Sequence, residues 1–242
     1  MIKACLFDMD GLLLNTEDLY TETTNEVLAE HGKGPLPWDV KINLQGRPGT
    51  DAAKHFLDWA QLPYTPEELF AKTSKIQETK WPRAAFMPGA LELLQFLDEN
   101  DIPFALATSS HTLNYQRKTD HLRHGFDLFR HHVVTGDDER VPAGRGKPHP
   151  DIWHAALESL NKEQKAAGKP LIEPHECLVF EDAVPGVRSG VASGATVIWV
   201  PHPEAMKVLG REEADRIIGG HGEILTSLEQ FDRAKYGLVK QK

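Results

Sequence analysis

Short apolar runs recur at wide spacing along the chain. Five of them are nearly continuous in apolar side chains rather than alternating with polar ones: residues 3–8, 102–108, 132–135, 177–180 and 196–200. A continuous run of this length is typical of a strand buried on both faces, as in a parallel sheet. Helical patterns lie between the later runs, at residues 90–99, 152–160 and 186–193. This order predicts an α/β fold, with a Rossmann-like parallel sheet core and helices on both faces.

One interval, residues 15–83, interrupts this alternation. It contains no convincing strand, and its pattern predicts three helices, at residues 17–30, 50–59 and 66–78. Thr65 is a suitable N-cap for the third helix, because its hydroxyl can accept a backbone N–H. A crossover between parallel strands needs only one helix, so we expect these residues to form an inserted module.

The insertion sets the expected domain boundaries. A disordered insert is the alternative, but the apolar content of this interval is too high for disorder. The sequence therefore predicts a core domain formed by residues 1–14 and 84–242. It predicts an all-helical domain formed by residues 15–83.

The composition argues against two classes of partner. The 242 residues carry a net charge of −9, whereas binding to nucleic acid needs a basic surface. No apolar run approaches the length that spans a membrane, and the first residues lack the pattern of a signal peptide. Cys5 and Cys177 lie in apolar runs, where we expect buried, unpaired thiols. We expect a cytoplasmic protein with no nucleic-acid or membrane partner, and nothing indicates its oligomeric state.

Twelve histidines raise the question of a zinc site. No His-Glu-x-x-His or Cys-x-x-Cys spacing occurs in the sequence. His131 and His132 are adjacent, so we expect their rings to point apart. The pattern therefore favours surface histidines over zinc ligands.

Two carboxylates follow the first apolar run directly. Asp8 and Asp10 are two residues apart and precede Gly11. Residues two apart in a strand face the same side, and ionised carboxylates are rarely buried without a partner. We therefore expect the strand to end at Asp8, with both acids at the carboxyl edge of the sheet, where α/β proteins bind ligands and where a cation can hold them. For either acid alone, a helix cap or a turn is the alternative.

Four segments together resemble the motifs of the haloacid dehalogenase-like (HAD) phosphohydrolases. Each is weak alone, but they occur in the order of the family and at strand ends or helix starts. In chain order the segments are Asp8-x-Asp10-Gly11, residues 102–110, residues 146–151 and residues 177–182.

This resemblance implies a reaction and roles for individual residues. It implies hydrolysis of a phosphomonoester through an aspartyl-phosphate, with Asp8 as the nucleophile and Asp10 as the acid and base. Thr108 and the backbone N–H of Ser109 would bind phosphoryl oxygens, and Lys147 would complete the charge clamp. The implied cofactor is Mg²⁺, which prefers oxygen ligands. Its implied ligands are Asp8, the backbone carbonyl of Asp10, Glu181 and Asp182.

In relatives with such an insertion, the helices form a cap that closes over the site. The resemblance places Gly46 and Arg47 on a cap loop that reads the substrate, with an exposed loop arginine as the equal alternative. The resemblance implies that the partner is a small phosphate ester, either pseudouridine 5′-phosphate or a glycerol or sugar phosphate.

Two other functions stay open at this point. Relatives that act as β-phosphoglucomutases carry a histidine near position 20 and a lysine three residues after the hydroxyl of the second motif. This chain has Tyr20 and His111 there, and both differences favour hydrolysis. Asp10 argues against cleavage of carbon–halogen bonds, which has no alcohol to protonate. The remaining alternative is a binding module with negligible turnover, although no motif residue is missing.

Overall fold

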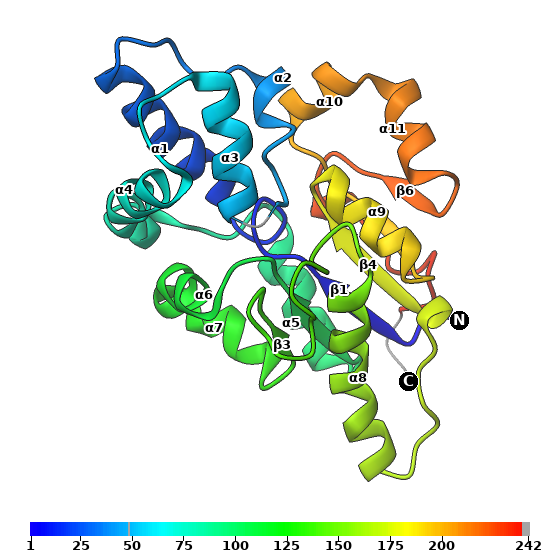
Figure 1. Cartoon of the computed structure of the whole chain (residues 1–242). Coiled ribbons are helices and arrows are strands. Elements are labelled where there is room, and N and C mark those ends of the chain that lie inside the picture. Colours follow the sequence, from blue (N-terminus) through cyan, green and yellow to red (C-terminus); the bar gives the residue numbers. More distant parts are fainter. Residues whose placement is uncertain (48, 239–242) are drawn as a thin grey trace.

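A single parallel sheet lies at the centre of the computed structural model, which describes residues 1–47 and 49–238 (Figure 1). Its order is β3-β2-β1-β4-β5-β6, and every neighbouring pair is parallel. The strands are β1 (Ala4–Phe7), β2 (Phe104–Ala107), β3 (Val133–Val134), β4 (Cys177–Glu181), β5 (Thr196–Trp199) and β6 (Gly222–Ile224). The five predicted strands are confirmed. The sequence did not predict β6, because three residues that include a glycine and a glutamate form no apolar run.

Helices cover both faces of the sheet, as predicted. Side chains alternate along β1, so that Cys5 and Phe7 face one layer while Ala4 and Leu6 face the other. The first layer contains α5 (Ala90–Glu99), α7 (Arg123–Phe126) and the 3₁₀ turns η3 (Asp127–Phe129) and η5 (Leu228–Gln230). The second contains α8 (Asp151–Ala166), α9 (Val184–Ala192) and α11 (Arg211–Ile218). The remaining elements of this part are α6 (Thr112–Thr119), α10 (Pro203–Leu209), η2 (Asp120–Leu122) and η4 (Pro174–Glu176).

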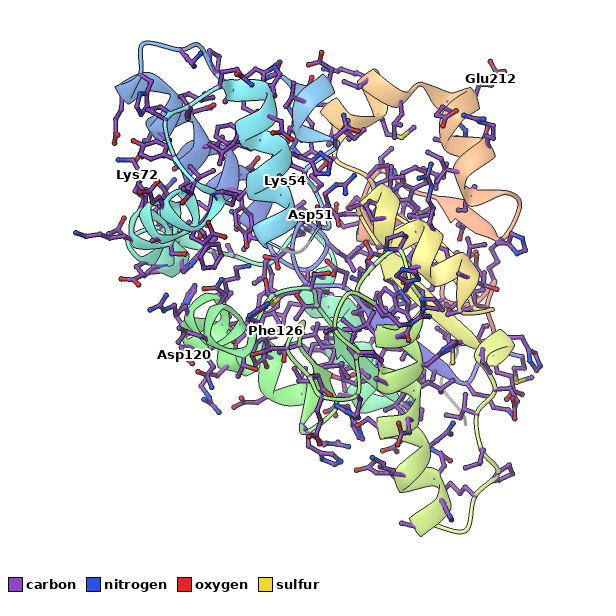
Figure 2. All side chains as sticks on the ribbon, viewed as in Figure 1. Asp51, Lys54, Lys72, Asp120, Phe126 and Glu212 are labelled. Carbon is purple, nitrogen blue, oxygen red and sulfur yellow. The ribbon has the colours of Figure 1, made fainter. Side chains whose placement is uncertain are left out.

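The segment between β1 and α5 is helical and lies beside the sheet (Figure 1, dark blue to teal). Figure 2 adds all side chains and labels Asp51 and Lys54 on α3 and Lys72 on α4. A separate apolar cluster lies between these helices, with Val27 and Phe56 among its members. The elements are α1 (Thr16–Glu30), α2 (Trp38–Lys41), α3 (Gly49–Ala60), α4 (Pro66–Glu78) and η1 (Trp81–Arg83).

The three predicted helices of this segment are confirmed within one residue at each end. Thr65 caps α4 as expected: its hydroxyl accepts the backbone N–H of Glu68, whose carboxylate accepts the N–H of Thr65. The sequence did not predict α2, which is a single turn and too short to show a helical period.

The two connections between the helical segment and the sheet run side by side. The backbone N–H of Asn15 donates to the carbonyl of Ala85 at 3.1 Å, and the N–H of Ala85 donates to the side-chain oxygen of Asn15 at 2.8 Å. Leu14 and Phe86 form an antiparallel bridge next to this pair. The helical segment therefore leaves and rejoins the sheet at one place.

Two expectations about side chains have different outcomes. Cys5 and Cys177 are free and buried, as predicted. The expectation that His131 and His132 point apart is wrong, because their Nε2 atoms lie 3.4 and 3.2 Å from the carboxylate of Glu163. Both histidines precede β3 rather than belong to it, so strand alternation does not apply.

None of the helices that the structure describes is both long and apolar enough to cross a bilayer.

Candidate active site

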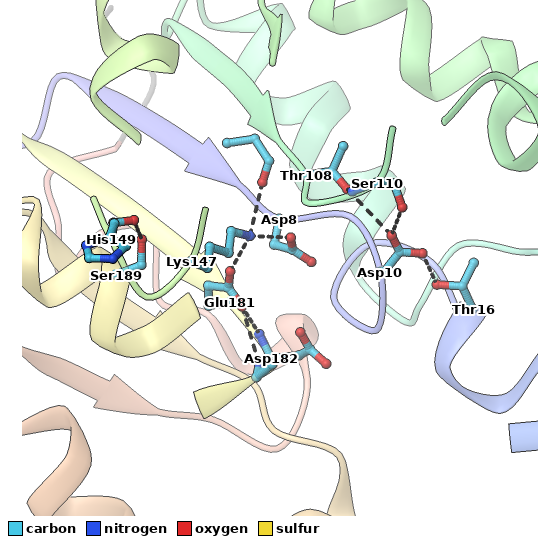
Figure 3. A network of polar contacts seen from close by, with 12 residues as sticks. Asp8, Asp10, Thr16, Thr108, Ser110, Lys147, His149, Glu181, Asp182 and Ser189 are labelled. Carbon is cyan, nitrogen blue, oxygen red and sulfur yellow. Dashed lines mark hydrogen bonds and ion pairs between the residues drawn. The ribbon is translucent and has the colours of Figure 1, made fainter. Parts of the chain in front are cut away.

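The candidate residues meet at the carboxyl edge of the sheet. Asp8 follows β1, Thr108 follows β2, and Glu181 ends β4. Because β1 lies between β2 and β4, these three positions are neighbours in space. Lys147 reaches them from the long connection between β3 and α8 (Figure 3). The four sequence motifs therefore form one site.

Lys147 links two of the carboxylates. Its Nζ donates to Oδ1 of Asp8 and to Oε1 of Glu181, both at 2.5 Å, and to the carbonyl of Ala107 at 3.2 Å. The side chain is buried and its Nζ lies 4.6 Å from the ring centroid of Trp153. Burial alone lowers the pKa of Lys147, but the carboxylates of Asp8 and Glu181 outweigh it and raise the pKa above its usual range. Lys147 is thus a fixed positive charge.

Three buried carboxylates lie close together here, and Lys147 forms ion pairs with two of them. Oxygen atoms of Asp8, Glu181 and Asp182 lie within 4.8 Å of one another. Burial raises the pKa of Asp8 to about 8 against the lowering effect of Lys147, and the charges of Glu181 and Asp10 add to the rise. Burial and the charges of Glu181 and Asp8 also raise the pKa of Asp182. Such a surplus of close negative charge fits a divalent cation with oxygen ligands.

Two glycines give these carboxylates room. Gly11 has φ of +85°, and a Cβ there would lie 2.3 Å from Oδ2 of Asp182. A Cβ at Gly186, in α9, would lie 1.9 Å from the carboxylate of Glu181. The second oxygen of Glu181 instead accepts the backbone N–H groups of Asp182 and Ala183. Glycine at both positions is therefore a requirement of the site.

Asp10 has partners of its own. Its Oδ1 accepts from the hydroxyl of Thr16 and from Nζ of Lys118, both at 2.6 Å, and its Oδ2 accepts from the hydroxyl of Ser110 at 2.8 Å. Burial opposes ionisation, but Lys118 and the two hydroxyl donors lower the pKa of Asp10 below its usual range. Asp8 and Asp10, two residues apart in the chain, therefore belong to separate networks (Figure 3).

Lys118 is a residue that the sequence reasoning missed. It lies on α6, is fully buried, and also donates to the hydroxyl of Tyr20 at 2.7 Å and to that of Ser110 at 2.8 Å. Its Nζ lies 4.8 Å from the ring centroids of both Tyr20 and Trp81. One signal was present in the sequence, since Lys118 follows Tyr115 by three residues and precedes Leu122 by four. A lysine in such an apolar stripe needs a buried acid as its partner.

Thr108 and Ser109 lie where the second motif predicts. Thr108 is buried, and its hydroxyl accepts the backbone N–H of Ser110 at 3.1 Å and lies 3.5 Å from Asp10. Ser109 lines a cavity of about 700 Å³ that also contains Asp8, Asp10 and Asp182 in its walls. The hydroxyl-bearing turn after β2 thus faces the same space as the carboxylates.

The cap loop reaches this cavity as well. Gly46 has φ of +70°, and a Cβ there would lie 3.1 Å from that of Ala183, so the loop closely approaches the core. Arg47 lines the cavity, but its guanidinium donates to the carbonyl of Asn43 at 2.6 Å and to the carboxylate of Asp51 at 2.8 Å. Gly46 and Arg47 both lie at the site, as predicted. The hydrogen bonds of Arg47, however, go to residues of its own helical segment.

Glu17 joins that loop to the core and was also missed. Its carboxylate accepts from the side chain of Gln45 at 3.1 Å, and Nζ of Lys41 lies 3.3 Å from the same oxygen. A Cβ at Gly11 would lie 2.8 Å from Cγ of Glu17, which places this acid beside the turn that follows Asp8. Glu17 therefore connects the turn of the first motif to the cap loop.

Comparison with known proteins identifies relatives of the chain. A family profile described as a haloacid dehalogenase-like hydrolase matches residues 2–194. The chain is 55% identical to the probable pseudouridine-5′-phosphatase of Saccharomyces cerevisiae, over 98% of each chain. It is 34% identical to the (DL)-glycerol-3-phosphatase 2 of Arabidopsis thaliana, over 98% of this chain and 92% of the relative.

A solved structure of similar architecture carries a ligand. It is a HAD family hydrolase from Deinococcus radiodurans R1 with bound phosphate and sodium. It shares 27% sequence identity and a TM-score of 0.73, over 100% of this chain and 99% of that one. From the matched profile, the relatives at more than 30% identity and the shared architecture, it follows that the chain belongs to the haloacid dehalogenase-like hydrolase family.

Proposed function

We propose that the protein is a Mg²⁺-dependent phosphomonoesterase that acts through an aspartyl-phosphate on Asp8. Its class, phosphoric monoester hydrolase, is that of its named relatives. The observation that carries the proposal is the separation of the two aspartates into different networks. Asp8 accepts a hydrogen bond from Lys147, whose positive charge reduces the repulsion between the nucleophile and the phosphoryl anion. Asp10 accepts hydrogen bonds from two hydroxyl groups and from Lys118. Two carboxyl groups in different environments can perform different chemical tasks.

In the first step, an oxygen of Asp8 attacks phosphorus and the bond to the alcohol oxygen breaks. Thr108 and Ser109 bind the phosphoryl oxygens, and Lys147 offsets their charge. Asp10 gives a proton to the departing alkoxide. The phosphoryl anion beside Asp10 raises the pKa of that carboxyl when substrate is bound, which favours the protonated form for this step.

In the second step, Asp10 accepts a proton from water while the water oxygen attacks phosphorus. The bond to Asp8 breaks, and inorganic phosphate is released. Lys118 favours the charged form of Asp10 that this step needs. We therefore assign Lys118 a positioning role, since it touches Asp10 and not the substrate.

The donor set fits Mg²⁺, whose ligands would be Asp8, the carbonyl of Asp10, Glu181 and Asp182. When bound, the ion neutralises charge on the phosphoryl oxygens and the carboxylates.

We place the cap at residues 15–83, with a core of 1–14 and 84–242, of which residues 239–242 lie outside the described part. A cytoplasmic location stays a prediction from the sequence.

The substrate that we propose is a small phosphorylated metabolite. The named activities of the relatives favour pseudouridine 5′-phosphate or glycerol 3-phosphate as the first to test. A phosphosugar mutase would interconvert sugar phosphates without net release of phosphate. Release of inorganic phosphate therefore separates hydrolysis from that alternative.

The test is phosphate release from para-nitrophenyl phosphate with Mg²⁺, with EDTA, and by Asp8→Asn. We expect EDTA and the substitution each to abolish turnover, because an amide is a poor nucleophile and a weak magnesium ligand. Thermal unfolding should show that Asp8→Asn remains folded. Near-normal turnover by this variant would refute the proposed nucleophile, and no release by the wild type would favour the binding module.

A further inference from the structure

A second group of possible metal ligands lies outside the active site. Among the residues that the structure describes, two groups of acidic and histidine side chains are close enough to hold a metal ion. One is the carboxylate group of the active site, and the other consists of His131, His132 and Glu163, here called the His–Glu cluster. Its three ligand atoms, one from each residue, lie within 4.8 Å of one another. The proposed reaction uses none of these side chains.

The His–Glu cluster joins an edge strand to a helix. Its two histidines lie between η3 and β3, directly before β3 begins, and Glu163 lies near the C-terminal end of α8. Because the strands are parallel, the start of β3 is at the amino edge of the sheet, whereas Asp8 and Glu181 are at the carboxyl edge. The cluster is therefore at the opposite edge of the sheet from the active site.

Both imidazole rings face the same carboxylate. Nε2 of His131 lies 3.4 Å from Oε1 of Glu163, and Nε2 of His132 lies 3.2 Å from Oε2. Hydrogen bonds between a charged N–H donor and a carboxylate are shorter, about 2.7–2.9 Å. A tetrahedral Zn²⁺ with bonds of about 2.0–2.1 Å separates its ligand atoms by about 3.3–3.4 Å. The spacing therefore fits ligands arranged around an ion better than direct ion pairs.

His132 is held in position by its surroundings. Its side chain is 5% exposed, and its Nδ1 lies 2.9 Å from the hydroxyl of Ser159 on α8. Its backbone N–H donates to the carbonyl of Phe129, and its carbonyl accepts the N–H of Leu106 in β2. A histidine that binds a metal usually has such a partner on its second ring nitrogen, which fixes the orientation of the ring. Nε2 of His132 is thus held toward Glu163.

The other two ligands are accessible to solvent. The side chains of His131 and Glu163 are 67% and 50% exposed. An ion can therefore enter, and water can fill the coordination position that the protein leaves open. Two imidazoles, one carboxylate and one water form a donor set that Zn²⁺ takes in proteins. Mg²⁺ prefers oxygen ligands, so the His–Glu cluster should favour Zn²⁺ over Mg²⁺.

We propose that His131, His132 and Glu163 form a Zn²⁺ site that links the start of β3 to α8. β3 consists of two residues at the edge of the sheet, and α8 packs against it. A metal link between the two elements stabilises an edge that few backbone hydrogen bonds hold. No zinc motif shows this in the sequence, because the histidines are adjacent and the glutamate comes from another element.

A count of bound ions tests the site. Equilibrium dialysis at about pH 7.5, where most histidine side chains are neutral, measures Zn²⁺ per chain while excess Mg²⁺ competes for the active-site carboxylates. We expect the wild type to bind one more Zn²⁺ than His131→Ala or Glu163→Gln. Loss of a partner outside the coordination shell already weakens metal binding about 10–100-fold, so loss of a ligand should cost at least about a hundredfold.

Two variants serve as matched controls. His175→Ala removes another exposed histidine, and Glu158→Gln removes another exposed glutamate of α8. Both should bind Zn²⁺ as the wild type does. Ser159→Ala retains all three ligands and should weaken Zn²⁺ binding about ten- to a hundredfold, because His132 loses the partner of its Nδ1.

Thermal unfolding provides a second measurement. An ion that binds only the folded chain raises the midpoint of unfolding. At a Zn²⁺ concentration about a hundredfold above Kd, the midpoint of the wild type should rise by about 5–10 °C more than that of His131→Ala or Glu163→Gln. Without Zn²⁺, all three proteins should unfold cooperatively, since both substituted side chains are largely exposed.

The opposite results would overturn the site. Equal numbers of bound Zn²⁺ and equal rises in midpoint for the wild type, His131→Ala and Glu163→Gln would place the zinc elsewhere. Equal losses in His175→Ala and Glu158→Gln would show non-specific binding at the surface. Equal affinity of the His–Glu cluster for Mg²⁺ and Zn²⁺ would contradict the donor set. None of these measurements requires turnover, so their outcome is independent of the proposed phosphatase activity.

Discussion

Neighbouring acids at this site differ because of the side chains that surround them. Asp8 lies among Glu181, Asp182 and Lys147, where burial and like charge raise its pKa. Asp10 accepts hydrogen bonds from Thr16, Ser110 and Lys118, which lower its pKa despite burial. The spacing of the two acids was evident in the sequence, but Lys118 is 108 residues from Asp10. Only the fold shows which acid has which partner.

Lys118→Met tests whether the lysine acts through Asp10. We expect slower hydrolysis of alkyl phosphates, because Asp10 loses a donor and its position becomes less fixed. Acid and base catalysis contributes about 10²–10⁴-fold, so the loss should be at least tenfold for an alkyl ester and smaller for para-nitrophenyl phosphate. Arg123→Met removes an exposed charge nearby and serves as the control.

The double variant makes that experiment decisive. If Lys118 positions Asp10, the variant with both Asp10→Asn and Lys118→Met should be no slower than Asp10→Asn alone. Losses that multiply would show that Lys118 contributes independently of Asp10.

The strands contribute to the site through the residues at their carboxyl ends. Sequence patterns located the ends of β1, β2 and β4, since apolar runs stop at the polar residues that form the site. They did not reveal α2, α6 or β6, which are too short or too polar to show a period. Nor did they reveal the contact of Glu17 with Gln45, because local patterns carry no information on side chains that meet through tertiary packing.

Gly186 shows how a helix is fitted to a strand end. Gly186→Ala would place a Cβ against the carboxylate of Glu181, and overpacking of this kind costs about 1–3 kcal/mol. We expect a lower midpoint of thermal unfolding and weaker Mg²⁺ binding, because Glu181 has to move. Gly34→Ala, where no atom lies within 4 Å, is the matched control. Unchanged metal affinity in Gly186→Ala would contradict this account.

Substitution of Arg47 tests whether the cap loop binds substrate. If its guanidinium leaves Asp51 to bind substrate, Arg47→Ala should lower kcat/KM for anionic or polar alcohols by about ten- to a hundredfold, the equivalent of about 1.5–3 kcal/mol. Para-nitrophenyl phosphate should be spared. An equal loss for every substrate would mean that the pair with Asp51 holds the loop in place, and Asp51→Ala should then reproduce it.

At the scale of the molecule, the carboxylate cluster couples stability to pH. Aspartate in an unfolded chain has a pKa near 3.9, whereas Asp8 in the folded protein has a pKa of about 8 and that of Asp182 is also raised. Between these values the folded state binds more protons than the unfolded state. The free energy of unfolding of the metal-free protein should therefore fall as pH rises from about 4 to about 8.

Mg²⁺ should counter this loss. The ion binds the ionised carboxylates of the folded chain, so the rise in unfolding midpoint on adding Mg²⁺ should be larger at pH 8 than at pH 5. Calorimetry with and without EDTA measures it. The Asp8→Asn variant should show a weaker dependence on pH, and an unchanged dependence would assign the effect to other groups.

The paired connections at Asn15 and Ala85 bear on how such a protein can diversify. The ends of the inserted segment lie one hydrogen bond apart, so the sheet meets the same boundary whatever helices are joined there. A short turn or a longer helical bundle could bridge those ends at little cost in loop entropy, which grows slowly with length. Evolution, or an engineer, can therefore exchange the lid as a cassette and retain the chemistry of the sheet edge beneath it.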